Sequence, residues 1–341
     1  MHCHLLVPGF GWPLGKASEV CHTLAANALE TLIARGRRTS VPASGPERWL
    51  LERFGVPRQH DWPAAPFSLL ADGGSPGHDE WICADPVHLR FERNRLMLAD
   101  CTQFRIARDE ADALAGSING HFGDSLVVHP LQAHRWYARL RERSAMETIP
   151  LSSVRGGAIE AALAHGPDAM RWQACTNELQ MLLHDHPVNL ARESRGELPV
   201  NSVWLWGAGR LPVLPDRPFQ YVVASDLLAR GLAQVSGAQA QELAADARSW
   251  LARSAHTGIG LFVLDSLAAP SQYGQAEAWR EALAKLELDW FAPLLAALKQ
   301  GTIGMLTLHL LGPKHALQVE VTRSDLRRFW RRRQPLSAWL A

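Results

Sequence analysis

The stretch from residue 176 to residue 209 holds most of the side chains that could do chemistry. An imidazole, two amides and a guanidinium occur there at short spacing, and they belong to His186, Asn189, Arg192 and Asn201. Such groups can bind an anionic or phosphorylated ligand, because the arginine fork matches a phosphate or carboxylate bidentately. In an ordinary helix–loop–strand crossover, however, asparagines bond the backbone of their own loop. The pattern alone leaves both interpretations open.

The elements around this stretch are indicated by its apolar spacing, its prolines and its glycines. Leucines recur at near-helical spacing up to Leu183, and Pro187 should end that helix. A polar loop follows, and residues 202–206 then form a buried type of strand that leads into the glycine turn 207–209. A helix, a polar loop, a core strand and a glycine turn are typical of a ligand site at the end of a sheet strand.

The residue order in this stretch resembles the archaeal type of cofactor-independent phosphoglycerate mutase. The resemblance rests on His186-Pro187-Val188-Asn189, Arg192, Gly196, Pro199-Val200-Asn201 and Gly207-Ala208-Gly209. The chain as a whole looks closer to a bacterial group of RpfE-type regulatory proteins and phosphoglycerate mutase-like proteins. That second resemblance runs from the opening Leu-Leu-Val-Pro-Gly-Phe-Gly-Trp-Pro to Phe329-Trp330-Arg331-Arg332. Both resemblances imply an alkaline-phosphatase-like α/β fold.

The resemblance also implies two divalent metal ions, held by Asp and His at strand ends, and a serine that carries the phosphoryl group. The metals would clamp the attacking and leaving oxygens of the transfer. Where the family has an Asp-Gly turn this chain has Pro8-Gly9, and no histidine directly follows Asp265. At the family's Asp-His-Ser only His309 is present. Asp265 and His309 are thus the remaining metal candidates. We expect no cofactor, and the alternative is two Mn or Mg ions.

The family's phosphate-binding arginine ahead of the glycine turn is also replaced, because Trp206 stands there and supplies no charge. The ligand hypothesis therefore includes a second polar group from an earlier part of the chain. Its members are Asp85, His88, Arg90, His134 and Arg135. Since inserted lobes in this family cover the active site, we expect the central polar residues to face Arg90 or Arg135 across a cleft. We assign no catalytic residue.

Beyond this stretch the chain predicts an α/β fold, with a mainly parallel sheet flanked by helices and a smaller inserted α+β lobe. Apolar runs predict strands that include 4–7, 258–264 and 304–311, and helical spacing predicts helices over 17–34 and 276–299, the latter kinked at Pro293. We expect Gly9, Asp265 and His309 near the carboxyl ends of neighbouring parallel strands. His2 and His4 alternate at a terminus that we expect to be mobile.

The predicted domains are a phosphatase-like core, formed by 1–80 and 176–341, and an inserted lobe at 81–175. Residues 55–80 hold four prolines and four glycines and are predicted to be a long surface loop or a lobe boundary. A chain of 341 residues exceeds what one compact core usually takes, so two lobes are expected.

Composition narrows the classes of partner and compartment. Lys plus Arg (35) nearly balance Asp plus Glu (34), which argues against nucleic acid or an anionic membrane bound mainly by charge. The five cysteines form no Cys-x-x-Cys pair, and no apolar run of about eighteen residues occurs. We expect a reduced, cytoplasmic protein with no membrane span.

Three hypotheses of function follow. The first is a metal-free, catalytically degenerate relative of the mutases with a ligand-binding or regulatory role, whose partner is a small phosphorylated or anionic ligand or another protein. The second is an active metal-dependent phosphoglycerate mutase or phosphohydrolase with displaced ligands. The third is an anion-binding surface protein that acts through its arginine-rich segment 327–333. Whether the chain is an enzyme is left open.

Overall fold

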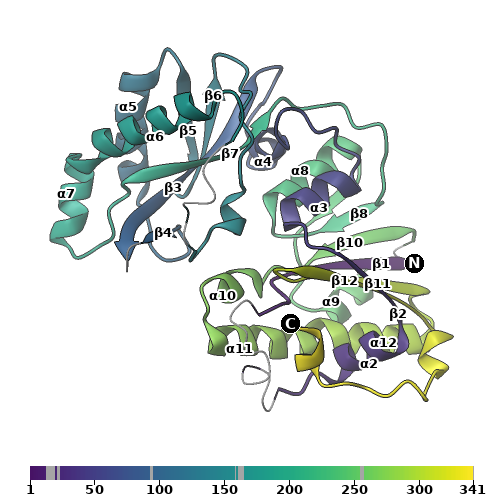
Figure 1. The fold of residues 1–341 in the computed structure, drawn as a ribbon. Coiled ribbons are helices and arrows are strands. Elements are labelled where there is room, and N and C mark those ends of the chain that lie inside the picture. The colour runs from purple at the N-terminus through teal and green to yellow at the C-terminus, as the bar shows by residue number, and fades with distance from the viewer. Residues whose placement is uncertain are drawn as a thin grey trace. The chain divides into compact units, whose positions relative to one another are not determined.

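The computed structural model describes residues 1–12, 20, 24–92, 95–157, 159, 165–253 and 257–340. The chain divides into two compact units, shown in Figure 1. Unit 1 comprises Met1–Phe54 and Pro215–Ala341, and unit 2 comprises Gly55–Leu214. Unit 2 is wider than the predicted lobe at both ends, because the central stretch pairs with the strands of unit 2.

In unit 1 the described residues form a seven-stranded sheet in the order β2-β12-β11-β1-β10-β8-β9. The strands are β1 (His2–Pro8), β2 (Arg37–Pro42), β8 (Tyr221–Val223), β9 (Gln239–Gln241), β10 (Ile259–Val263), β11 (Met305–Leu311) and β12 (His315–Thr322). From β11 to β9 all neighbouring strands run parallel. At the other edge β12 pairs antiparallel with β11, and β2 pairs antiparallel with β12. The predicted α/β class with a mainly parallel sheet is confirmed.

Helices cover both faces of this sheet (Figure 1). On one face lie α2 (Asn27–Arg35), α9 (Ala247–Arg253), α11 (Ala276–Leu286) and α12 (Ala292–Gln300), and on the other lie α3 (Pro46–Arg53) and α8 (Leu227–Ser236). The short α10 (Ala268–Gln272) follows β10. Much of the first part of the predicted helix 17–34 lies outside the described residues, and α2 begins at Asn27.

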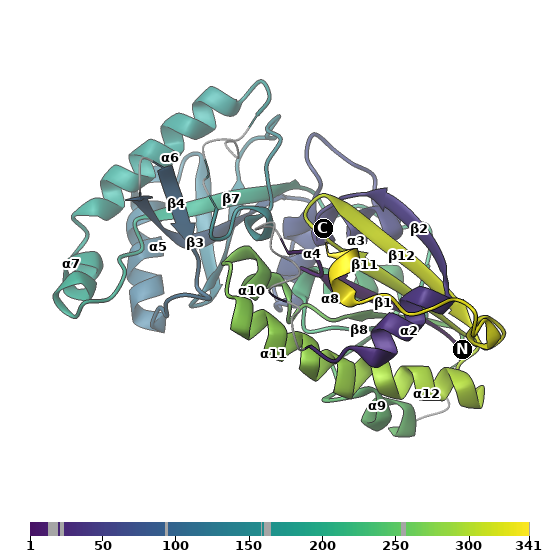
Figure 2. The same cartoon turned by 60° about the horizontal axis from the view of Figure 1, so that its bottom comes forward.

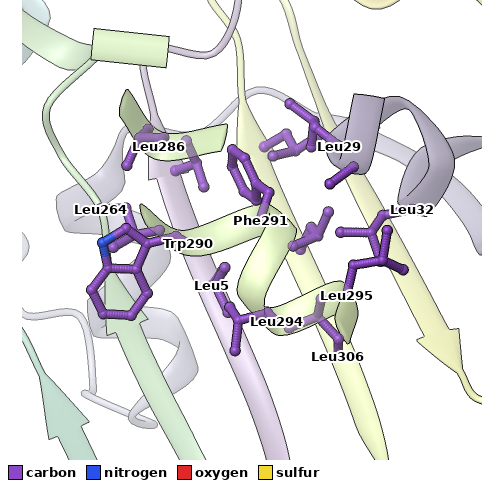
Figure 3. Packing of buried hydrophobic residues seen from close by; sticks show 14 of the residues in the cluster. Leu5, Leu29, Leu32, Leu264, Leu286, Trp290, Phe291, Leu294, Leu295 and Leu306 are labelled. Carbon is purple, nitrogen blue, oxygen red and sulfur yellow. The ribbon is translucent and has the colours of Figure 1, made fainter. Parts of the chain in front are cut away.

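The main core of unit 1 lies between the sheet and the first group of helices. Figure 3 shows Leu5 and Leu306 from the sheet beneath Trp290, Phe291 and other apolar residues of the helical layer. The predicted long helix is present, and α11 and α12 follow one another along its length (Figure 2). A π segment, Glu287–Phe291, joins them and ends two residues before Pro293. Because proline lacks an N–H, a regular ladder cannot continue there.

Unit 2 is built on an antiparallel sheet with the order β4-β3-β6-β5, and β7 pairs with β3 outside that path. The strands are β3 (Glu80–Glu92), β4 (Arg95–Ala99), β5 (Leu126–Gln132), β6 (Arg135–Leu140) and β7 (Ser202–Gly209). The helices are α4 (Ala64–Ala71), α5 (Arg108–Phe122), α6 (Ala169–His184) and α7 (Pro187–Ser194). No helix in the described part of the chain is long and apolar enough to cross a membrane.

Three local expectations are wrong. Residues 55–80 are not a long surface loop, because they contain α4, whose residues are largely buried; the alternative of a lobe boundary agrees with the start of unit 2 at Gly55. Pro187 follows the end of α6 but also begins α7 as its first residue, so the predicted polar loop is mostly helix. The glycines at 207–209 form no turn. Instead β7 continues to Gly209, and its register against β3 shifts there as in a β-bulge. The φ of 72° at Gly207 favours glycine.

Candidate functional site

The carboxyl ends of the central strands in unit 1 are the first place to look for chemistry. β1 lies between β10 and β11, and all three run parallel. Gly9 directly follows β1, Asp265 follows the end of β10 by two residues, and His309 lies within β11, two residues before its end. The predicted placement of these three residues on neighbouring parallel strands is confirmed.

The end of β1 offers backbone rather than ligating side chains. Pro8 closes the strand, and Gly9 has a φ of 76°. A Cβ atom at Gly9 would lie 2.6 Å from both the Cα of Ala268 and the carbonyl oxygen of Leu267. The indole Nε1 of Trp279 donates to the Gly9 carbonyl at 2.8 Å. This turn is therefore packed tightly against the helices that follow β10.

His309 is buried in a group of aromatic rings on one face of the sheet. Its Nε2 lies 3.0 Å from Nδ1 of His4, and the two rings stack at 5.3 Å with an interplanar angle of 8°. Trp49 of α3 covers His309, with the ring centroids 4.6 Å apart. The His2 ring also contacts the His4 ring, with the centroids 4.1 Å apart and the planes tilted by 37°. The expectation of a mobile terminus here is wrong, because both histidines belong to the central strand β1.

Electrostatics keep these imidazoles neutral. Burial lowers the pKa of His4 and of His309 to about 3, and for each the neighbouring imidazoles and Arg53 lower it further. Neutral imidazoles can ligate a metal, but the Nε2 of His309 already contacts Nδ1 of His4. The Asp265 side chain, by contrast, is exposed.

These residues do not fit a two-metal site. Such a site needs several anionic or imidazole ligands around each ion. Pro8 offers no ligand atom in its side chain, Asp265 is a single carboxylate, and His309 is turned toward His4. Within the described ranges no group of three or more His, Cys, Asp or Glu could hold a metal ion.

The His-Pro-Val-Asn segment of unit 2 folds as the start of α7. His186 is the N-cap residue, and its Nδ1 accepts from the backbone N–H of Val188 at 3.2 Å. Its Nε2 lies 2.9 Å from the Ser117 hydroxyl. Asn189 is 1% exposed; its Nδ2 donates to the carbonyls of Leu183 and Val200, and its Oδ1 accepts from the N–H of Val200. The asparagine thus ties the end of α6 to the chain ahead of β7.

Arg192 is equally committed to the protein. Its side chain is 1% exposed and forms an ion pair with Glu110 of α5 at 2.5 Å. Its Nε and NH2 donate to the backbone carbonyls of Leu198 and Arg105, each at 2.8 Å. The guanidinium that the sequence suggests for a phosphate therefore holds α7 against α5 and the segment after α7.

Two further residues of the predicted ligand group bond across the sheet of unit 2. Asn201 accepts from the N–H of Leu89 and donates to its carbonyl, both at 2.8 Å. The Nδ1 of His88 lies 2.9 Å from the Pro199 carbonyl oxygen. Both interactions fasten the segment before β7 to β3, so these side chains act as links between backbones.

Asp85 lies in a polar cluster that the structure brings together. Trp206 donates its indole N–H to Asp85 at 2.6 Å. Burial raises the pKa of Asp85 to about 6, although the hydrogen bond from Trp206 and the charge of Arg155 act in the opposite direction. Arg155 forms an ion pair with Asp100 at 2.5 Å. No local sequence pattern indicates the pair of Arg155 and Asp100, because it joins the residue after β4 to a segment 55 positions further along the chain.

The two arginines expected to face the motif have other surroundings. Arg90 is exposed and forms an ion pair with Glu92. Arg135 donates from both Nε and NH2 to the carboxylate of Asp72, at 2.9 and 2.7 Å, and also contacts His134. Among the described residues, neither arginine forms a hydrogen bond or ion pair with His186, Asn189 or Arg192, so the expected arrangement across a cleft is not supported.

A cavity of about 480 Å³ in unit 2 has a different lining. It lies beside the end of β7, and its charged residues are Asp61, Glu80, Arg143 and Arg210. Glu80 accepts from the N–H of Ser144 at 2.8 Å and lies 3.6 Å from Arg210. The predicted ligand residues are not part of this lining.

Comparisons with known proteins connect the chain to phosphoglycerate mutases. No protein-family profile matches it. Over 128 residues it is 30% identical to a probable 2,3-bisphosphoglycerate-independent phosphoglycerate mutase of Geobacter sulfurreducens, covering 37% of this chain and 32% of that protein. Over 194 residues it is 26% identical to such a mutase of Methanosarcina mazei, covering 54% of this chain and 48% of that protein. The chain thus spans a third to a half of the length of these curated relatives.

Among solved structures, a protein from Pyrococcus horikoshii aligns with a TM-score of 0.56 at 13% identity, over 94% of this chain and 87% of that one. This likeness concerns the fold alone. Together with the sequence matches, it shows a chain of mixed α/β fold that is related to the cofactor-independent phosphoglycerate mutases.

Proposed function

We propose that the chain is a catalytically degenerate, metal-free relative of the cofactor-independent phosphoglycerate mutases, and that it acts by binding a ligand or a partner. A regulatory role of the RpfE type is the form that the whole-chain resemblance favours. The observation that carries the proposal is the set of side chains at the carboxyl ends of β1, β10 and β11. Pro8, an exposed Asp265 and a His309 that contacts His4 occupy the places where the resemblance implies metal ligands.

The balance of charge at the strand ends supports the absence of a metal pair. A pair of divalent ions brings four positive charges into a small volume, and several anionic or imidazole ligands must balance and hold them. With Asp265 and His309 alone, water would fill most coordination positions, so the ions would bind too weakly to remain during purification. A phosphoryl transfer without them loses nucleophile activation and charge stabilisation, which contribute several kcal/mol.

The proposed partner is a small phosphorylated or anionic molecule, or another protein. Arg192 does not serve such a ligand in this proposal, because its buried guanidinium is engaged by Glu110 and two carbonyls. The motif in unit 2 instead has a structural role.

An active metal-dependent phosphoglycerate mutase or phosphohydrolase is the second candidate. It is favoured by one observation, the similarity to proteins whose names state mutase activity. In that case Asp265 would be the carboxylate most needed, since it follows the strand next to β1.

The purified full chain tests both candidates. Conversion of 3-phosphoglycerate is measured with and without added manganese, and manganese binding is measured by titration calorimetry. We expect no turnover above background and no stoichiometric manganese, with Asp265→Ala indistinguishable from the wild type. Asp216→Ala, which removes another exposed carboxylate of unit 1, is the matched control. Manganese-dependent turnover that Asp265→Ala abolishes and Asp216→Ala preserves would establish the enzyme instead.

A further inference from the structure

A cavity of about 440 Å³ lies at the opposite end of the unit 1 strands from Gly9 and Asp265. It opens where β2 begins, where β12 ends and where β11 begins at Met305. Its charged lining consists of Arg37, Arg38, Arg328, Arg331, Glu320 and Asp325. Four arginines against two carboxylates leave two positive charges. Small-molecule sites span roughly 300–1,000 Å³, so the cavity can hold more than a single inorganic anion.

Two of these arginines, Arg328 and Arg331, belong to the arginine-rich segment 327–333, and contacts with the rest of the protein hold their guanidinium groups in place. The NH1 of Arg331 donates to the carbonyl of Gly36 at 2.9 Å and to that of Arg35 at 3.4 Å, at the end of α2. Arg328 forms an ion pair with Asp325 at 2.9 Å. Held in this way, a guanidinium loses less conformational entropy when it binds an anion.

The carboxylates of the cavity are occupied by protein donors. One oxygen of Asp325 accepts from both the N–H and the hydroxyl of Thr322, at 2.9 and 2.7 Å. Burial acts to raise the pKa of Asp325, but these hydrogen bonds and the nearby arginines lower it overall, so the group stays ionised beside Arg328. Glu320 accepts from Gln318 at 2.9 Å.

The edge strand β2 brings the other two arginines. Arg37 is exposed, stands opposite Glu320 in the strand register, and makes no side-chain hydrogen bond or ion pair with any residue that the structure describes. The guanidinium of Arg38 lies 4.8 Å from the ring centroid of Trp339. The donors of Arg37 are therefore available to a ligand.

From this geometry we propose that the cavity binds a small phosphorylated molecule carrying at least two negative charges. Arginine forks match phosphate oxygens bidentately, and the two surplus charges balance a dianion. The site lies at the amino end of β11 and does not depend on the proposed function, since an active mutase could also carry it.

Titration calorimetry of the full chain with inorganic pyrophosphate tests the proposal. We expect saturable binding to one site that weakens as salt rises. Arg37→Gln should weaken binding by on the order of tenfold, because one charge-assisted contact is lost. The affinity of Arg37→Lys should lie between those of the wild type and Arg37→Gln, since lysine keeps the charge but lacks the two-pronged guanidinium. Arg332→Gln is the matched control, because Arg332 is an exposed neighbour outside the lining, and it should change the affinity less than about twofold.

Three results would overturn the proposal. The absence of saturable binding to the wild-type protein would show that the cavity takes no such anion. Equal weakening by Arg37→Gln and Arg332→Gln would show diffuse attraction to the arginine-rich segment rather than a site. Tighter binding of a hexaglutamate peptide than of pyrophosphate would assign the cavity to an acidic protein segment. Arg331→Gln is measured alongside with circular dichroism, because Arg331 also bonds the end of α2.

Discussion

The strand ends of unit 1 and the His-Pro-Val-Asn segment of unit 2 differ in what they could offer to a metal or a ligand. At the strand ends the backbone arrangement is present, but Pro8 and the paired His309 leave few groups for a metal. In unit 2 the motif side chains are present, but Asn189 and Arg192 bond the protein itself. The motif side chains of unit 2 thus hold the fold together, whereas the strand ends of unit 1 present few ligating side chains.

Replacing Arg192 should give the largest change in stability, and it tests whether the motif in unit 2 has a structural role. Arg192→Ala removes a buried ion-pair partner of Glu110 and two donors to carbonyls, which should lower the free energy of unfolding by about 3–5 kcal/mol. Arg195→Ala is the control, because Arg195 contacts the same Glu110 but is exposed to solvent; it should destabilise the protein much less than Arg192→Ala does. Urea unfolding of the full chain measures both. If Arg192→Ala left stability intact but removed ligand binding, the motif would be a binding site after all.

Replacing the asparagines of the motif tests the same structural role, with smaller expected losses of stability. Asn189→Ala takes away three hydrogen bonds at a buried position and should destabilise the protein by about 2 kcal/mol. Asn201→Ala removes two bonds at a partly exposed position and should cost about 1 kcal/mol. Thermal melts compare the two. Equal and negligible losses would contradict a structural role for the motif.

The smallest expected effect concerns the imidazoles of unit 1. His309 has a folded pKa near 3, below its value of about 6.5 in the unfolded chain, so the unfolded state binds more protons as the solution is acidified. Stability present above pH 6.5 is therefore lost as the pH falls from 6.5 toward 3. Between pH 7 and about pH 5.5 the wild type should lose about 1 kcal/mol more than His309→Gln, which cannot titrate there. Parallel stability curves for the two proteins would show that His309 is not a buried neutral group.

The sequence predicted where the strands lie better than it predicted which strands pair with one another. Apolar runs located β1, β10 and β11, and their parallel order placed Gly9 and Asp265 correctly. The strand β7 was also located, but alternation along a strand does not say which sheet it joins. Its pairing with β3 moved the motif into unit 2. Proline gave an ambiguous signal as well, because Pro187 both excludes one helix and starts another.

The candidate site was harder to predict, because the same types of side chain can either bind a ligand or form hydrogen bonds that stabilise the fold. What decides for Arg192 is Glu110, which lies 82 residues earlier in the chain. The pair of His4 with His309 joins positions 305 residues apart. No local pattern contains such neighbours. The arginine-rich segment 327–333 was recognised, but only the tertiary structure adds Arg37 and Arg38 from β2 to it.

The central position of β1 also governs the order in which the chain can fold. Residues 2–8 pair only with β10 and β11 among the described strands, so both partners follow more than 250 residues later. Unit 2 is one uninterrupted segment, Gly55–Leu214, and all its strands precede β10. During synthesis it can close while β1, with its apolar Leu5, Leu6 and Val7, still has two open edges and is exposed to wrong pairing. Of the described strands, β1 is synthesised first and is among the last to be paired.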